Sequence, residues 1–165
     1  MTEMQFTPEG NARAFRDALG RYATGVTVVT CATAGGPMGF TANSFAAVSL
    51  DPALVLWSPA KSSSRFVHYA QAQHYAIHVL EAGHVDWLPR FGRDGAGFHG
   101  LSHEMNAEGV PVIHGALARF DCAQHATHDG GDHLIVVGRV LRATYRDGAP
   151  LVFSQGAYGR FANGL

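Results

Sequence analysis

The chain has 165 residues, the size of one domain, and we expect a single domain over residues 1–165. Hydrophobic residues make up 47% and charged residues 15%, which is enough for a sizeable core and excludes a disordered chain. The low share of charged residues indicates an oligomer, in which part of the surface is covered. A net charge of −1 without a Lys or Arg block argues against nucleic-acid binding, and no apolar run is long enough to span a membrane.

The first predicted element is an amphipathic helix. Thr7-Pro8-Glu9 supplies an N-cap residue, a first-turn proline and an early acid, and Gly25 closes the segment. Between these signals, apolar residues recur with helical spacing at Phe15, Ala18, Leu19 and Tyr22.

The rest of the chain is rich in β-branched and aromatic residues separated by turn signals, which predicts mainly strands. The predicted strands cover residues 26–32, an extended run from 38, and residues 48–50, 54–57, 75–80, 116–127, 134–145 and 151–153. Ser62 is predicted to cap one short helix, residues 85–91 form another, and the Gly- and His-rich segment 91–110 is typical of a long surface loop.

Short connections between consecutive strands favour a closed antiparallel barrel with a few peripheral helices. Regular alternation of strands and helices is absent from the sequence, as are the GxGxxG and GxxxxGK[ST] motifs. If the protein uses a nicotinamide cofactor, we therefore expect it to bind that cofactor without a Rossmann fold.

The segment Pro59–Arg65 has the composition of a phosphate site. It combines Lys61, the only lysine in the chain, with Arg65, three serine hydroxyls and the free N–H groups of a helix start. These are the groups that neutralise and hold a phosphate. The alternative is an ordinary serine-capped helix with solvated charges.

A second unusual segment is Gly39–Phe45, which is followed by Ser49. Small polar residues between strand-forming aromatics suit the edge of a planar heterocycle, whose ring atoms need hydroxyl and amide partners. The alternative is an edge strand whose polar side chains face water.

Ten histidines raise the question of a metal, but His125, His128 and their acidic neighbours lie at a predicted hairpin tip without zinc-type spacing, so we predict no metal. His133 differs because it leads into an apolar strand, where it can donate to a ligand near neutral pH.

Cys31 and Cys122 stand singly in predicted strands and are expected to be buried thiols in a reducing cytoplasm. Residues 1–5 lack the features of a signal peptide, so we expect a cytoplasmic protein.

Together these segments resemble the flavin reductase family, whose members have the FMN-binding split-barrel fold. The similarity runs from Phe15 to Phe161, and the order of the motifs carries it. The motifs are Ala23–Val26, Gly39–Phe45, Val48–Pro52, Lys61–Ser64, Gly131–His133, Gly138–Val140, Pro150–Phe153 and Gly156–Gly159. Ala53 and Trp57–Ala60 depart from the family pattern, which leaves the flavin open as FMN or FAD.

The resemblance implies a six-stranded antiparallel Greek-key barrel, a homodimer and a flavin near the subunit interface. Thr41, Ala42, Asn43 and Ser44 would line the isoalloxazine and ribityl chain, with Ser49 beside the ring. Ser58, Lys61, Ser62, Ser63 and Ser64 would hold the ribityl and phosphate end. His133 would sit where the nicotinamide of NADH or NADPH stacks on the flavin, with Tyr158 close by.

The implied activity is hydride transfer from nicotinamide C4 to flavin N5, with the reduced flavin supplied to a separate monooxygenase. Other functions remain open: a flavin store, sensor or electron carrier without efficient NAD(P)H turnover, a pyridoxine-phosphate-type oxidase, and a metal-dependent hydrolase. The oxidase needs a second basic pocket, which a chain with one lysine can hardly build.

Overall fold

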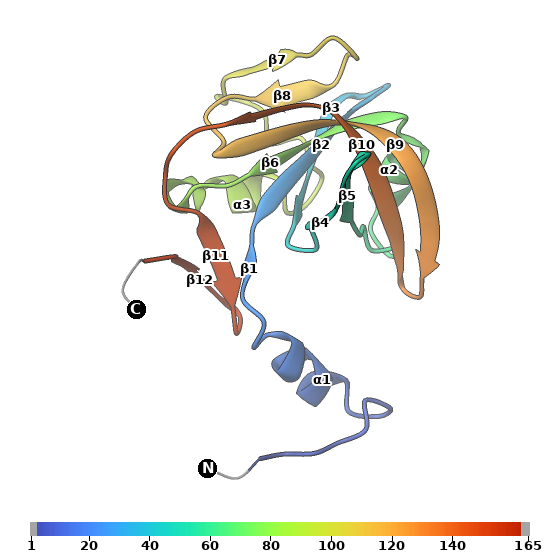
Figure 1. Ribbon diagram of the computed structural model, residues 1–165, viewed down its shortest axis with the longest axis vertical. Coiled ribbons are helices and arrows are strands. Elements are labelled where there is room, and N and C mark those ends of the chain that lie inside the picture. The colour runs from blue at the N-terminus through green and yellow to red at the C-terminus, as the bar shows by residue number, and fades with distance from the viewer. Residues whose placement is uncertain (1–2, 163–165) are drawn as a thin grey trace.

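The computed structural model describes residues 3–162 and consists mainly of antiparallel strands (Figure 1). Its central sheet has seven strands in the order β3-β2-β6-β9-β10-β5-β4. Along the chain these are β2 (Thr27–Thr33), β3 (Gly36–Ala42), β4 (Ala46–Leu50), β5 (Ala53–Trp57), β6 (His74–Val79), β9 (Ala118–Gly130) and β10 (His133–Tyr145). The predicted class, an antiparallel β-fold with few helices, is confirmed, with one strand more in this sheet than the six expected.

Two smaller sheets and several short helices accompany the central sheet. One sheet has the order β1-β11-β12 and the other pairs β7 with β8; the strands are β1 (Thr24–Gly25), β7 (His103–Met105), β8 (Pro111–Ile113), β11 (Leu151–Ser154) and β12 (Ala157–Arg160). The helices are α1 (Ala12–Leu19), α2 (Phe66–Gln71), α3 (Trp87–Arg90) and the 3-10 turn η1 (Ala82–His84). None of the helices between residues 3 and 162 has the length and apolar character to cross a membrane.

Helix α1 is shorter than the sequence predicts and stands away from the barrel (Figure 1). Gly10 has φ +76°, and the Asn11 amide donates to Thr7 O at 3.0 Å, so residues 7–10 form a turn and the helix begins at Ala12. The predicted end is also wrong, because the helix stops at Leu19 and Gly25 belongs to β1. A glycine at positive φ outweighs the local cap signature of Thr7 and Pro8.

The barrel interior is filled by aromatic and aliphatic side chains. Trp57 and Tyr69 are fully buried and pack edge to face with ring centroids 5.1 Å apart. Cys31 and Cys122 are buried free thiols, as predicted. Burial raises the pKa of Cys31 to about 11 and that of Cys122 to about 12, so neither thiol supplies a thiolate nucleophile near neutral pH.

The segment 91–110 is only partly the surface loop that its composition predicts. Phe91 and Phe98 are buried against each other, with ring centroids 5.2 Å apart, and β7 forms within the segment. Gly95 has φ +78°, and its carbonyl accepts the Gly39 N–H at 2.8 Å. Glycines therefore let this part of the chain pack closely against β3.

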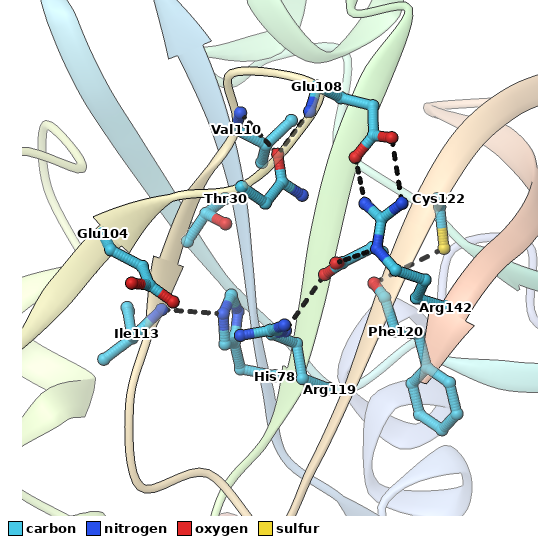
Figure 2. Close-up of polar contacts among 12 residues, drawn as sticks. Thr30, His78, Glu104, Glu108, Val110, Ile113, Arg119, Phe120, Cys122 and Arg142 are labelled. Carbon is cyan, nitrogen blue, oxygen red and sulfur yellow. Dashed lines mark hydrogen bonds and ion pairs between the residues drawn. The ribbon is translucent and has the colours of Figure 1, made fainter. Parts of the chain in front are cut away.

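A buried histidine anchors the β7–β8 sheet to the barrel (Figure 2). His78 is fully buried in β6; its Nδ1 lies 3.0 Å from Val28 O, and its Nε2 accepts the Ile113 N–H at 3.0 Å. Because a carbonyl only accepts, Nδ1 carries the proton and the ring is neutral. Burial lowers the pKa of His78 to about 4.

Arg119 of β9 pairs with His78 of β6 in the central sheet. The carboxylate of Asp121 joins Arg119 to Arg142 of β10; Figure 2 shows both arginines. This buried carboxylate lies 3.0 Å from Arg119 Nε and 3.3 Å from Arg142 Nε. Arg142 also donates to Glu108 at 3.1 Å, in the connection between β7 and β8. These ion pairs complete the attachment of the small sheet.

Candidate functional site

The candidate site lies where the two edges of the central sheet meet. Strands β3 and β4 are the outer strands of the sheet, yet residues 43–45 alone connect them. Such a link spans at most roughly 14 Å, at about 3.6 Å per residue, so the sheet must curl until its edges lie close together. The polar segment predicted to face a ring therefore forms the seam of the barrel.

A cavity of about 140 Å³ opens beside this seam. Thr41, Ala42 and Asn43 line it together with Tyr158, although these residues lie far apart in the sequence. Val26 and Phe153 complete the lining. The structure thus brings three of the predicted ring-lining residues to Tyr158 in one place.

Within residues 3–162, the Thr41 hydroxyl is buried and has no hydrogen-bond partner. A buried polar group normally has one, because leaving it unpaired costs about 1–3 kcal/mol. Strand β3 is an edge strand, as the alternative interpretation requires, but this hydroxyl does not face water. An unpaired hydroxyl that lines a cavity suits a ligand with hydrogen-bonding ring atoms.

The two predicted site segments are adjacent. The Ser58 N–H donates to Ser44 Oγ at 2.9 Å, and the Ser44 hydroxyl lies 3.4 Å from Ser58 O. Ser49 is half-buried in β4 and pairs with Leu54 of β5, the strand that leads to Ser58. Residues 41–49 and 58–64 therefore meet on one side of the barrel seam.

The predicted phosphate segment runs along the start of β10. The Lys61 N–H donates to Asp132 O at 2.9 Å, and the Leu134 N–H donates to Pro59 O at 3.1 Å. Ala60 forms an isolated bridge with His133. The Lys61 ammonium makes an ion pair with Asp129 at the hairpin tip, and Ser62 and Ser64 are exposed while Ser63 is half-buried.

Two predictions for this segment are wrong. Arg65 is buried: its guanidinium donates to the carbonyls of Gly39 at 2.9 Å, Phe91 at 2.6 Å and Gly92 at 3.3 Å, so it does not join Lys61 as a second surface cation. Ser62 does not cap α2, because the serines form turns and Arg65 occupies the position before Phe66. The planar fork of arginine satisfies several carbonyls at once, and this favours the interior position.

His133 begins β10, as predicted, and is half-exposed next to the phosphate segment. Its Nδ1 lies 2.6 Å from Asp132 Oδ1, and this contact holds the pKa of Asp132 below its usual value. His133 and Ser58–Ser64 lie outside the lining of the cavity. Among residues 3–162, no group of three His, Cys, Asp or Glu side chains is arranged to hold a metal ion.

Sequence reasoning missed Val26 and Phe153 as lining residues and Asp129 as the partner of Lys61. Phe153 lies in one of the motifs that carry the family resemblance, next to the Gly156–Gly159 motif, so its place was open to recognition. Asp129 carries no such signal, since 68 residues separate it from Lys61.

A curled antiparallel barrel with a cavity at its seam, lined by apolar side chains and a few polar groups, is typical of barrels that bind a small ligand. The flavin reductase like domain model matches residues 19–162. The chain therefore belongs to the flavin reductase family.

Relatives agree with this assignment. The chain is 60% identical over 161 residues to the FMN reductase (NADH) SmoA of Agrobacterium fabrum, covering 97% of this chain and 92% of SmoA. It is 39% identical over 148 residues to the monooxygenase reductase subunit HsaB of Rhodococcus jostii, covering 88% and 76%.

A solved structure supports the fold. The NADH:FAD oxidoreductase SgcE6 of Streptomyces globisporus superposes with a TM-score of 0.91 at 35% identity and covers 100% of this chain and 95% of its own. A second structure of SgcE6 contains NAD and FAD fragments. The predicted split-barrel fold and flavin reductase class are confirmed.

Proposed function

We propose that the protein is an NADH-dependent FMN reductase that supplies reduced FMN to a separate flavin-dependent oxygenase. The observation that carries the proposal is the buried, unpaired Thr41 hydroxyl in the lining of a cavity at the barrel seam. The 60% identity to an FMN reductase (NADH) favours FMN and NADH over FAD and NADPH. The reductase subunits among the relatives favour a separate oxygenase as the acceptor.

The residues present fit a flavin. Thr41, Asn43 and the backbone of Ala42 offer donors and acceptors to the polar edge of the ring, with Phe153 and Tyr158 as apolar walls. Ser44 and Ser49 extend this polar edge. The ribityl and phosphate groups are held by Lys61 and four serines, Ser58, Ser62, Ser63 and Ser64. When bound, the flavin accepts the hydride that the nicotinamide supplies.

His133 is a positioning residue for the nicotinamide. With Nδ1–H donated to Asp132, the imidazole is held in one orientation and its Nε2 is left for a ligand. The half-exposed ring lies next to the phosphate segment, through the bridge between His133 and Ala60. This role requires orientation of the substrate and no proton transfer by His133.

The protein acts as a homodimer in this proposal. Helix α1 has no buried residue, and its apolar side chains are exposed: 43% for Phe15 and 57% for Leu19. The cavity of about 140 Å³ is also below the range of about 300–1,000 Å³ that is common for ligand sites. A second copy that covers α1 and adds a wall to the cavity accounts for both observations.

The test is a flavin titration of the purified protein followed by anaerobic addition of NADH. A reductase binds FMN and oxidises NADH as the flavin absorbance bleaches. A flavin store or sensor binds FMN and leaves NADH unchanged, whereas a metal-dependent hydrolase binds a metal and no flavin.

Thr41→Val sharpens the test, because valine keeps the shape of threonine and removes the hydroxyl. It should weaken FMN binding without lowering the melting temperature of the apoprotein. Thr27→Val is the matched control: the Thr27 hydroxyl is buried and donates to Ala42 O at 2.8 Å, so this change should reduce stability and spare flavin affinity. If Thr41→Val binds FMN as the wild type does, the ring assignment fails.

A further inference from the structure

Lys61 already has an anionic partner in the free protein. It is the only lysine in the chain, and its ammonium makes an ion pair with the carboxylate of Asp129. The contact also holds the pKa of Asp129 below its usual value, with the Lys61 hydrogen bond as the main cause. An incoming phosphate therefore meets a cation whose charge is neutralised.

The nearest alternative cation in the sequence cannot replace it. Arg65 points into the interior, where it lies 4.2 Å from the centroid of the Phe40 ring and donates to three backbone carbonyls. Within the segment 58–64, Lys61 is the one cation, so its pair with Asp129 leaves the segment without net charge.

The backbone fixes this arrangement. Lys61 N–H donates to Asp132 O at 2.9 Å, and Asp129 faces Leu134 across the same hairpin. The hairpin tip thus keeps the carboxylate beside the lysine in a set register. The Asp129 side chain is 79% exposed and that of Lys61 39%, so the aspartate can return to water when it is displaced.

We propose that Asp129 competes with the flavin phosphate for Lys61, so that FMN binds only by displacing Asp129 and is readily released for transfer. This inference rests on the proposed function, since it assumes that Lys61 holds the phosphate. The competition weakens FMN and leaves riboflavin, which lacks the phosphate, unaffected. Because oxidised and reduced FMN carry the same phosphate, the competition weakens both forms and so eases release of the flavin after its reduction.

The experiment compares FMN and riboflavin dissociation constants, measured by quenching of flavin fluorescence, for the wild type and Asp129→Asn. Asparagine keeps an acceptor oxygen for the Gly131 N–H but loses the charge. FMN should bind about fivefold more tightly to Asp129→Asn, the size of effect expected for an exposed ion pair, with riboflavin unchanged. Asp132→Asn is the matched control, because its carboxylate pairs with His133 at the same tip.

The Lys61→Met background decides the mechanism. There Asp129→Asn should leave FMN affinity unchanged, because no ammonium remains to compete for. Three results would overturn the competition. Asp129→Asn and Asp132→Asn could change FMN affinity equally, Asp129→Asn could change riboflavin affinity, or Asp129→Asn could leave FMN affinity unchanged. If Lys61→Met itself leaves FMN affinity unchanged, the phosphate assignment fails and the competition fails with it, whereas NADH oxidation by the wild type still tests the reductase function separately.

Discussion

Gly138 in β10 is predicted to be indispensable for packing against Tyr75. A Cβ at this position would overlap the Tyr75 hydroxyl, lie 2.9 Å from Tyr75 Cζ and lie 3.2 Å from Cys122 Cβ. All three groups are in the fully packed interior, where an extra methyl group costs about 1–3 kcal/mol. We expect Gly138→Ala to lower the free energy of unfolding by about 2 kcal/mol, which is roughly 4–8 °C in melting temperature for a chain of this size.

Removing the Tyr75 hydroxyl tests whether that oxygen is the atom that clashes with the new Cβ. The Tyr75 hydroxyl is buried and, within the described residues, forms no hydrogen bond of normal geometry. Tyr75→Phe should therefore change stability by less than about 1 kcal/mol. In that background Gly138→Ala should cost about half as much, because Cζ still crowds the new methyl group, and the coupling energy should be about 1 kcal/mol.

Urea unfolding followed by circular dichroism, at one fixed protein concentration, measures the free energy of unfolding of the wild type, the two single variants and the double variant. Gly25→Ala is the control, since Gly25 is also in a strand and a Cβ there meets no atom within 4 Å among the described residues. Equal losses from Gly138→Ala in the wild type and in the Tyr75→Phe variant would refute the assignment of the clash to the hydroxyl.

Three further predictions concern other single residues. His133→Ala should raise KM for NADH several-fold with little change in flavin affinity; an unchanged KM in steady-state assays would remove the positioning role. The folded-state pKa of about 4 for His78 lies below the unfolded value of about 6.5, so its neutral form gives full stability above about pH 6.5, and roughly 3 kcal/mol is lost as the pH falls to about 4. Urea unfolding from pH 7 to 4 should show this loss in the wild type and a shallower one in His78→Gln. Arg65→Met should destabilise the fold by about 1–3 kcal/mol for each buried carbonyl that it leaves unpaired, and a stable variant in thermal unfolding would contradict this.

Much of the fold was predictable because local patterns and tertiary packing agree. The β-branched run at residues 26–32 became β2, and the turn at Asp51-Pro52 joins β4 and β5 as expected. Strand β12 was missed because Ala157–Arg160 is exposed along its length and lacks the apolar alternation of a half-buried strand. Its pairing with β11 supplies the missing partner, and this contact is not visible in the segment itself.

The candidate site was predictable only in parts. Small polar residues at 41–44 and 58–64 stand out locally, and the structure places these segments side by side through Ser44 and Ser58. The cavity lining was harder to predict, because Thr41 of β3 meets Phe153 of β11 and Tyr158 of β12 only in the folded structure. Which hydroxyl remains unpaired depends on this packing and not on the residue type.

The clearest limit is the different fate of the two cations in one segment. From the sequence, Lys61 and Arg65 are four residues apart and look equivalent, but the turns between them direct one to the hairpin tip and the other to the interior. Arginine suits the buried position because its fixed fork serves several carbonyls, and lysine suits the exposed one because a single flexible ammonium exchanges partners easily. In a chain with one lysine among twelve basic residues, the lysine therefore stands at an exposed position, which is where our proposal requires a phosphate to bind and leave.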